Sequence, residues 1–428
     1  MRAWVAGLAV LAGLTLPVTL TTPAAAAQGG TFAYVTNQAD GTVSVIDTAT
    51  NTVTTTIPVG DVPEKAAITP DGKRLYVTKF NSGDVSVIDT TTNTVIDTVT
   101  VGSGPRGVAI TPDGTRAYVT NVLSNSVSVI DTATNTVIDT VGTNPAEVAI
   151  TPNGAFAYVS NFASDDVSVI DTATNTVVDT VTVGDGPQGL AVTPNGAFVY
   201  VANGNATTVS VIDTATNNVV DTVTVGNSPQ GVAVTPNGAF VYVANSLSDD
   251  VSVIDTATNN VVDTVTVGTL PQSLAITPNG AFVYVANGSS NDVSVIDTAT
   301  NNVVDTVPVG TSPFGVEIGT VPSSSVATCP PRQSPHRRRI PAHRPAAERP
   351  HQPTGRRLVG SVPDQPDQRG HHLHALRGLR RHHAVGPEER IRVVRTAPSR
   401  IPGDHRSIAE LSVGRGVDQR HGGDPAHS

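Results

Sequence analysis

The sequence predicts an all-β fold, a seven-bladed β-propeller with four strands in each blade. Three observations lead to this prediction. A unit of about 42 residues recurs seven times, each unit holds four short runs rich in Val, Ile, Thr and aromatic residues, and the first and last units supply parts of one blade. Repeats of this length with four strands each are typical of propeller blades.

The repeat is clearest in the tripeptide Ile-Asp-Thr, whose Asp recurs at intervals of 42, 42, 40, 42, 42 and 42 residues. One tyrosine per unit keeps the same intervals. A register kept over seven units indicates one structural module repeated along a solenoid or around a ring. The aspartates are Asp47, Asp89, Asp131, Asp171, Asp213, Asp255 and Asp297, and the tyrosines are Tyr34, Tyr76, Tyr118, Tyr158, Tyr200, Tyr242 and Tyr284.

A single unit shows the four strands. Residues 231–235, 239–245, 251–255 and 260–267 are runs of β-branched and aromatic residues, and the turn sequences Pro-Asn-Gly and Ala-Thr-Asn separate them. These runs and turns predict antiparallel strands joined by tight connections. No useful helical period occurs before residue 320.

Ring closure is predicted from the two ends of the repeat region. The first unit begins at its second strand, residues 31–37, and residues 314–319 match the first strand that it lacks. We therefore expect residues 314–319 to complete the blade begun by residues 31–60, which removes an open sheet edge. We interpret the 40-residue interval as two residues lost from a fourth strand between Asp139 and Pro145, a loss that leaves the remaining side chains on their faces.

The ends of the chain differ from the repeats in composition. Residues 1–27 combine Arg2, an apolar run and four alanines, which predicts a Sec-type signal peptide and a secreted or cell-surface protein. The apolar run falls short of a bilayer span. Residues 28–319 form the propeller. Residues 320–428, with Cys329, are rich in Arg, His and Pro and lack Tyr, Phe, Trp, Lys and Asn, which predicts a disordered tail or a shifted reading frame.

The net charge of −10 averages unlike parts of the chain. Residues 28–319 hold 27 acidic and six basic residues, whereas residues 320–428 hold nine acidic residues and 19 arginines. The acidic propeller disfavours nucleic acids and anionic membranes as partners. It contains no His and no Cys, the usual ligands of copper, haem iron and zinc, so we expect no metal, no cofactor and no catalytic residue of the Ser-His-Asp kind.

The tyrosines carry a family resemblance. Residues 34–37 and 118–121 read Tyr-Val-Thr-Asn, four other units read Tyr-Val-Ala-Asn or Tyr-Val-Ser-Asn, and the unit at Tyr76 departs with Lys79. With Pro-Asn/Asp-Gly before the tyrosine and Val-Ile-Asp-Thr after it, residues 28–319 resemble the YVTN-repeat β-propellers of surface-layer and secreted proteins. The resemblance implies seven blades and no single chemistry, because such propellers serve as binding modules, lactonases and quinoprotein subunits.

The repeated Asp of Ile-Asp-Thr has two interpretations. It could bind calcium or act as an acid or base, or it could cap an Asx-type turn by accepting main-chain N–H groups. We favour the turn, because the loop lacks the ligand spacing of an EF-hand. The ring of tyrosines is likewise predicted to pack between blades rather than to hold a substrate.

Comparison of the repeats predicts one variable face. Two connections hardly change between blades, whereas the connections between second and third strands and the proline linkers vary, and both variable types should emerge on one face. The residues after the linker prolines should surround the channel mouth, with Ala146 there and Glu147 beside it. The candidate ligand residues are Glu64, Arg106, Glu147, Gln188, Gln230, Gln272 and Phe314, and the candidate partner contacts are Phe80, Leu123, Phe162 and Leu247.

These patterns predict a secreted, monomeric binding or structural module that contacts a protein or a cell-wall glycan. The alternative is an enzyme at the channel mouth, a lactonase-like hydrolase using Glu64, Arg106 and Glu147, or a quinoprotein-type subunit. We favour the binding module because blades four to seven are almost identical. An active site needs differentiated and preorganised groups.

Overall fold

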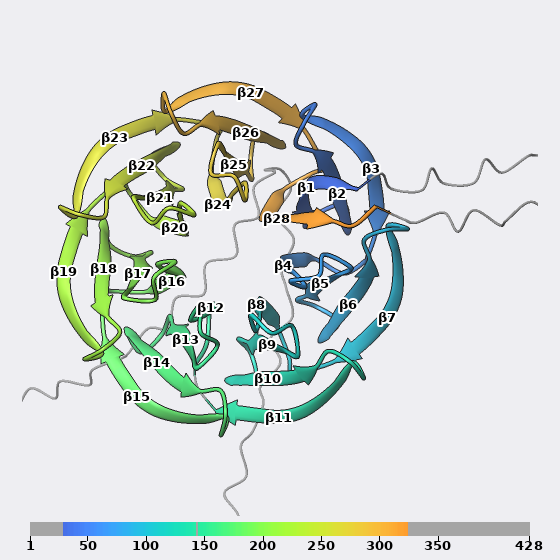
Figure 1. The fold of residues 1–428 in the computed structure, drawn as a ribbon, viewed down its shortest axis with the longest axis horizontal. Coiled ribbons are helices and arrows are strands. Elements are labelled where there is room, and N and C mark those ends of the chain that lie inside the picture. The colour runs from blue at the N-terminus through green and yellow to red at the C-terminus, as the bar shows by residue number, and fades with distance from the viewer. Residues whose placement is uncertain (1–28, 143, 324–428) are drawn as a thin grey trace, which may run out of the picture. The chain divides into compact units, whose positions relative to one another are not determined.

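The computed structural model describes residues 29–142 and 144–323, which form a seven-bladed propeller (Figure 1). Seven sheets of four antiparallel strands surround a common axis, as the repeat predicts. The described residues contain no helix that could cross a membrane. The predicted signal peptide and nearly all of the predicted tail, from residue 324 onward, lie outside the described residues.

The strands occupy four positions in each blade, counted outward from the axis. The innermost strands are β28 (Pro313–Val321), β4 (Pro63–Ile68), β8 (Pro105–Ile110), β12 (Val148–Ile150), β16 (Pro187–Val192), β20 (Pro229–Val234) and β24 (Pro271–Ile276). The second strands are β1 (Gly30–Asn37), β5 (Arg74–Lys79), β9 (Arg116–Asn121), β13 (Phe156–Asn161), β17 (Phe198–Asn203), β21 (Phe240–Asn245) and β25 (Phe282–Asn287). The third strands are β2 (Thr42–Asp47), β6 (Asp84–Asp89), β10 (Ser126–Asp131), β14 (Asp166–Asp171), β18 (Thr208–Asp213), β22 (Asp250–Asp255) and β26 (Asp292–Asp297). The outer strands are β3 (Thr52–Pro58), β7 (Thr94–Thr100), β11 (Thr136–Gly142), β15 (Thr176–Thr182), β19 (Asn218–Thr224), β23 (Asn260–Thr266) and β27 (Asn302–Pro308).

Blade 1 closes the ring as predicted. Its sheet has the order β28-β1-β2-β3, so the last described strand pairs with the first. The pairing runs from Gly30 opposite Val321 to Asn37 opposite Pro313. Strand β28 therefore continues two residues past the predicted end at 319, because β1 offers partners for Thr320 and Val321. Blades 2 to 7 follow in chain order, from β4–β7 to β24–β27.

The hydrophobic core lies between neighbouring blades. One buried cluster joins Tyr34, Val45 and Ile57 of blade 1 to Leu75 and Ile88 of blade 2, and similar clusters occur at the other junctions. The second and third strands carry consecutive buried residues, whose side chains point to opposite faces of the sheet, so each blade packs against two neighbours. The seven tyrosines are fully buried in these clusters, which confirms the prediction of packing between blades.

Six of the tyrosines also tie neighbouring blades together. Tyr76 donates a hydrogen bond to Oδ1 of Asn135 in the next blade at 2.7 Å, and Nδ2 of Asn135 donates to Asp97 at 2.8 Å. Tyr284 joins blade 7 to blade 1 in the same way, by donating to Asn51 at 2.5 Å. The remaining ties join Tyr118 to Asn175, Tyr158 to Asn217, Tyr200 to Asn259 and Tyr242 to Asn301.

The junction between blades 1 and 2 lacks this tie. Tyr34 Oη and Asn93 Oδ1 are buried there without a hydrogen-bond partner among the described residues. The difference follows from the sequence, because Thr55 of β3 stands where the outer strands of the other six blades carry an Asp. Asn93 therefore has no carboxylate to hold its amide as Asp97 holds Asn135.

The prediction of a shortened fourth strand is wrong. Strand β11 has seven residues, as many as β7, and pairs with β10 along its whole length. The two-residue loss falls after Gly142, in the linker, and the next strand, β12, has three residues instead of six. The outer strand keeps its length because Val141 must stay buried against the core, whereas a linker between blades is free to shorten.

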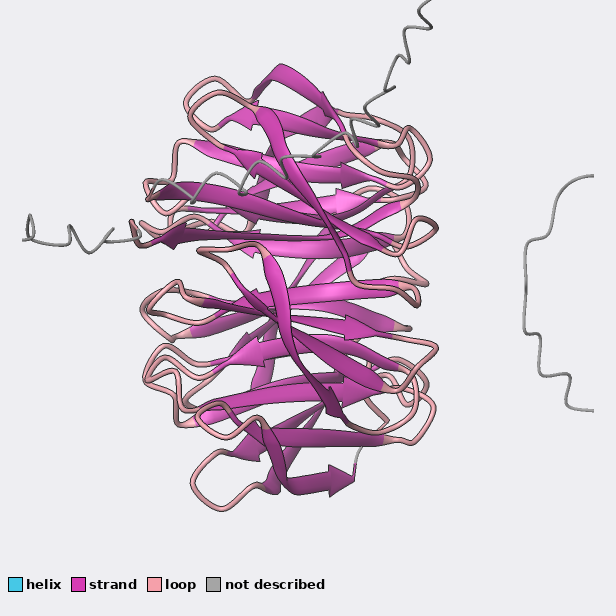
Figure 2. Ribbon diagram, turned by 90° about the vertical axis from the view of Figure 1, so that its right-hand side faces the viewer, coloured by secondary structure: helices cyan, strands magenta, loops and turns pink. Residues whose placement is uncertain are grey.

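The connections between strands gather on two opposite faces of the disc, as the side view of Figure 2 shows. Leu123 lies in a connection between a second and a third strand, and its N–H donates to Ser103 O of a proline linker at 3.1 Å. The two variable types of connection therefore share one face, as predicted. We call this the variable face. On the opposite, uniform face, Thr256 N–H donates to Ala239 O at 3.0 Å and joins the two conserved turns.

The Asp of each Ile-Asp-Thr motif caps its turn, which confirms the favoured interpretation. Asp255 Oδ1 accepts the main-chain N–H groups of Ala257 and Thr258 at 3.0 and 2.9 Å. The same capping occurs at Asp47, Asp89, Asp131, Asp171, Asp213 and Asp297. These carboxylates are therefore committed to the backbone.

Candidate functional site at the propeller axis

The innermost strands bring a cluster of unlike side chains to the propeller axis. We call Glu64, Lys65, Arg106, Glu147, Ser273 and Phe314 the axial cluster. Its members come from blades 1, 2, 3, 4 and 7 and follow the linker prolines directly, so they lie at the variable-face end of the axis. A Cβ added at Gly315 would stand 2.5 Å from Glu64 O, which shows that neighbouring innermost strands lie close together here.

Lys65 is the centre of the contacts in the axial cluster. Its ammonium donates a hydrogen bond to Ser273 Oγ at 2.9 Å and lies 3.8 Å from Glu147 Oε1. It also lies 5.4 Å from the ring centroid of Phe314. These contacts join residues that are 82 to 249 positions apart in the sequence.

Arg106 completes the cluster from blade 3. Its Nε lies 3.8 Å from Glu147 Oε1, and its guanidinium lies 5.6 Å from the ring centroid of Phe314. Arg106 Nε is buried and has no hydrogen-bond partner among the described residues. Two cations thus share one carboxylate and one aromatic ring, an arrangement in which attraction to the ring quadrupole adds to the ion pairs.

Two glutamates at the axis have raised pKa values. Burial raises the pKa of Glu64 to about 7, and the neighbouring Glu147 carboxylate adds to the rise. Arg106, Lys65 and a 2.8 Å hydrogen bond from Gln38 oppose the rise without cancelling it. Burial likewise raises the pKa of Glu317 to about 7, against the opposing effects of the N–H of Ile68 and the charge of Lys65. Glu317 is only partly buried, so some of the residue remains accessible to solvent.

The structure brings some of the predicted ligand residues together and leaves others apart. Arg106, Glu147 and Phe314 are in contact, and Glu64 lies within electrostatic range of the first two. Ala146 is buried. The three glutamines have no hydrogen bond to the axial cluster among the described residues: Gln188 and Gln230 lie beside Gly204, and Gln272 lies beside Gly288.

The sequence prediction missed Lys65, Ser273, Glu317 and Gln38. A clue was present in the repeats, because Lys65, Glu147 and Ser273 occupy the second position after the linker proline, where the other four blades have Gly. Glu317 stands where the other six blades have Ala. Comparing these positions across blades would have found three of the four residues. Gln38 reaches Glu64 from a connection whose sequence varies from blade to blade, so no pattern identifies it.

The predicted partner contacts are exposed to different degrees. Leu123 and Leu247 are 65% and 70% exposed, Phe162 is 38% exposed, and Phe80 is half-buried. Leu247 lines a cavity of about 620 Å³ between blades 5 and 6, whose other walls are the mostly polar residues 204–208 and 227–228. The variable face therefore combines apolar side chains with a polar depression.

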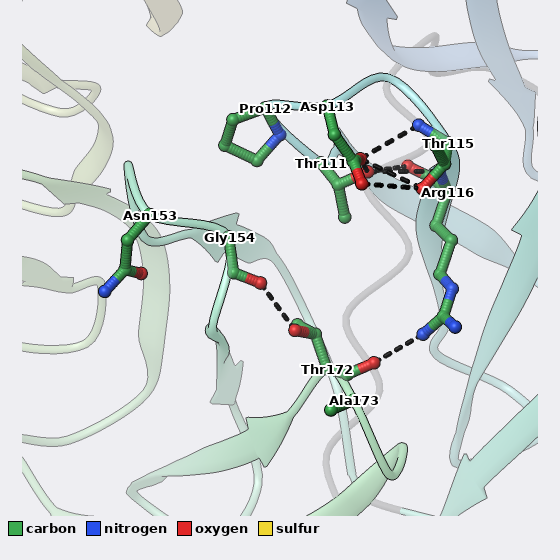
Figure 3. A pocket seen from close by; sticks show the side chains of 9 residues that line it. All are labelled: Thr111, Pro112, Asp113, Thr115, Arg116, Asn153, Gly154, Thr172 and Ala173. Atoms are coloured by element: carbon green, nitrogen blue, oxygen red, sulfur yellow. Dashed lines mark hydrogen bonds between the residues drawn. The ribbon is translucent and has the colours of Figure 1, made fainter.

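The uniform face is differentiated at two junctions that the sequence prediction treated as alike. A cavity of about 260 Å³ lies between blades 3 and 4. Arg116 lines it and donates a hydrogen bond to Thr172 O of the next blade (Figure 3). Arg74 makes the same bond to Thr132 O in the preceding cavity, of about 630 Å³. The other five blades have Phe at this position. Both arginines are engaged with the next blade, which makes them structural ties.

The chemistry available at the axis is limited to carboxylates, two cations, a hydroxyl and an aromatic ring. No group of three or more His, Cys, Asp or Glu side chains within residues 29–142 and 144–323 is arranged to hold a metal ion. The cations could orient an anionic group, and Glu64 could exchange a proton near neutral pH.

The fold and this axial arrangement define a β-propeller with a differentiated axis. The chain belongs to the family described as "Lactonase, 7-bladed beta-propeller", whose model matches residues 90–223 and 212–307. A model described as "YNCE-like beta-propeller" matches residues 1–101. The YVTN repeat type named from the tyrosine motifs is a finer assignment than these matches make.

Solved structures share the propeller fold. Hydrazine synthase from Kuenenia stuttgartiensis is 28% identical, with a TM-score of 0.58 over 62% of this chain and 92% of that chain. A functionally unknown protein from Desulfotomaculum acetoxidans is 21% identical, with a TM-score of 0.62 over 68% of this chain and 99% of that one. A putative 6-phosphogluconolactonase from Bacteroides uniformis is 18% identical, with a TM-score of 0.58 and the same two coverages. No curated protein matches this chain.

Proposed function

We propose that the protein is an exported binding module that holds a protein or cell-wall glycan partner on its variable face. The observation that carries the proposal is the cavity of about 620 Å³ beside Leu247, on the face where Leu123 is also exposed. Exposed apolar side chains around a polar depression suit a macromolecular or glycan surface. The predicted signal peptide and the YVTN-like tyrosine motifs support a location outside the cell.

The axial cluster supports this proposal from within the disc. Its ion pairs and its hydrogen bond join strands from distant blades, so they fix the inner ends of the loops that form the variable face. A rigid scaffold below variable loops is the usual arrangement of a binding surface.

Attachment to cells tests the proposal. The secreted protein is compared with a Leu123→Ser, Leu247→Ser variant for binding to intact cells and isolated cell walls. A matched control, Val178→Ser with Val262→Ser, removes side chains that are each 54% exposed on outer strands. We expect binding to weaken at least tenfold in the first variant and to stay unchanged in the control. Equal binding by both variants would overturn the proposal.

A second candidate function is lactone hydrolysis, and the pKa of about 7 at Glu64 favours it together with the family match. In this reaction Glu64 would accept a proton from water as the water oxygen bonds to the lactone carbonyl carbon, and Arg106 would stabilise the oxyanion. The bond from the carbonyl carbon to the ring oxygen would then break as Glu64 returns the proton to that oxygen, which gives a hydroxy acid.

Alanine at Glu64, Arg106 and Glu147, with an assay of lactone hydrolysis, tests this second function. Turnover by the unmodified protein that falls at least a hundredfold in the Glu64→Ala variant would establish it. A rate equal to that of buffer would remove it. Gln38 donates a hydrogen bond to Glu64, and Glu147 pairs with Arg106, so both reacting groups already have partners. We therefore place this function second.

A further inference from the structure

Six of the seven outer strands carry an Asp whose carboxylate accepts a main-chain N–H group of the same strand. Asp97 Oδ1 accepts the main-chain N–H of Thr98 at 2.8 Å. That N–H is therefore not free to pair with an additional strand, and the carboxylate places a negative charge on the strand. The same bond, at the same distance, occurs at Asp139, Asp179, Asp221, Asp263 and Asp305. Charges on edge strands are a common protection against association.

Strand β3 lacks this protection. Thr55 takes the place of the Asp, and β3 contains no charged residue from Thr52 to Pro58. Within residues 29–142 and 144–323 it pairs with β2 on one side and with no strand on the other. Thr52, Val53, Thr54 and Thr56 are exposed. The change also leaves Tyr34 Oη and Asn93 Oδ1 buried without hydrogen-bond partners among the described residues, so Thr55 has a local cost at the junction of blades 1 and 2.

We propose that β3 is a strand-pairing surface for a second copy of this chain, which adds its own β3 in antiparallel orientation. The two blades then form one continuous sheet across a twofold axis. This departs from the monomer expected from the sequence, because ring closure joins β28 to β1 but leaves every outer strand as an edge.

The charge pattern selects a second copy as the partner. Self-pairing of β7 or any other outer strand would place identical Asp residues near one another, which is unfavourable, whereas β3 places Thr opposite Thr. The propeller is strongly acidic elsewhere, so two copies approach most easily at an uncharged edge. One such edge per molecule gives a closed dimer rather than a filament.

Sedimentation velocity of the full secreted chain tests the dimer. We expect a reversible monomer–dimer equilibrium over a concentration series and its loss in Thr55→Asp, which also supplies the missing carboxylate to Asn93. Thr55→Lys introduces the opposite charge and should abolish the dimer as well. Ser124→Asp adds the same charge on the variable face and should keep it. A monomer at all concentrations, or a dimer in Thr55→Asp, would overturn the proposal.

Disulfide trapping tests the site directly. In a Cys329→Ser background, Thr55→Cys places one thiol on β3, and antiparallel self-pairing brings two such thiols within bonding reach. We expect a covalent dimer under mild oxidation and none in the matched Ser124→Cys variant. If the two copies associate through a different segment of the chain and the thiols introduced on β3 form no crosslink, the proposal is contradicted.

Discussion

Lys65 Nζ donates a hydrogen bond to Ser273 Oγ at 2.9 Å, joining blades 2 and 7 across 208 residues of sequence. Both residues replace a Gly of the repeat, and Glu147, a third such replacement, is the ion-pair partner of Lys65. Departures from a repeat that meet in space indicate a site that has been built into an otherwise uniform ring.

Removing the charge of Lys65 should therefore destabilise the fold. Lys65→Met leaves Glu147 with Arg106 alone in a place where both partners are mostly buried, and we expect a loss of about 1–2 kcal/mol in the free energy of unfolding. Lys73→Met is the control, because its pair with Asp71 is more than half exposed, and it should cost less than about 0.5 kcal/mol. Urea denaturation measures both. Equal losses would contradict the structural role of the cluster.

The tyrosine ties predict a contrast between two identical substitutions. Tyr242→Phe removes the hydrogen bond to Asn301 and leaves the amide unpaired, so it should cost about 1 kcal/mol. Tyr34→Phe removes a buried hydroxyl that has no partner among the described residues, so it should be neutral or slightly stabilising. Thermal unfolding of the two variants distinguishes them, and a larger loss for Tyr34→Phe would show that its hydroxyl is bonded in solution.

The raised pKa values of Glu64 and Glu317 predict a pH dependence of stability. Both groups have a pKa of about 7 in the fold, against 4.5 for an ordinary Glu, so folding favours their protonated forms. Their contribution is complete below pH 4.5 and is lost as the pH rises to about 7. It amounts to on the order of 2 kcal/mol for each group, once solvent access is allowed for.

Thermal midpoints from about pH 4.5 to about pH 8 measure this slope. Glu64→Gln and Glu317→Gln should each remove part of it, and the double variant should be nearly flat. The capping aspartates act in a different range. Hydrogen bonds from the backbone and side chain of Thr134 lower the pKa of Asp131. The contribution of Asp131 to stability is therefore present above the ordinary pKa of Asp and is lost only as the pH falls below it. A double variant that keeps the full slope would contradict the assignment.

The capped turns predict how the Ile-Asp-Thr motif responds to substitution. Asp255→Ala removes the acceptor of two main-chain N–H groups and should cost about 1 kcal/mol, whereas Asp255→Asn keeps an acceptor and should cost less than half as much. Addition of EDTA should leave the thermal midpoint unchanged. A midpoint that falls with EDTA and recovers with calcium would instead support the calcium interpretation.

The repeat made most of the fold predictable. Its constant interval, its four runs per unit and the match of residues 314–319 to a missing strand give seven blades and the closure through β28. The two missing residues near Gly142 were assigned to the wrong element. The sequence shows that two residues are absent, but it does not show whether the outer strand that pairs with β10 or the linker after it is shorter.

The site was less predictable. Proline positions located Glu64, Arg106 and Phe314, but neither the closeness of Lys65 to Ser273 nor the burial of Glu317 follows from spacing, because both depend on how blades 1, 2 and 7 meet at the axis. The exposure of Leu123 and Leu247 could be expected from their loops, whereas the cavity beside Leu247 required the structure.

The central claim, that the variable face holds the partner, is tested most directly by hydroxyl-radical footprinting of the secreted protein with and without solubilised cell-wall fragments. We predict protection of Leu123 and Leu247 and of their loops, residues 122–126 and 246–250. The turns of the uniform face, at 153–154 and 237–238, should react equally in both samples. Protection of those turns with no change at Leu123 and Leu247 would contradict the account.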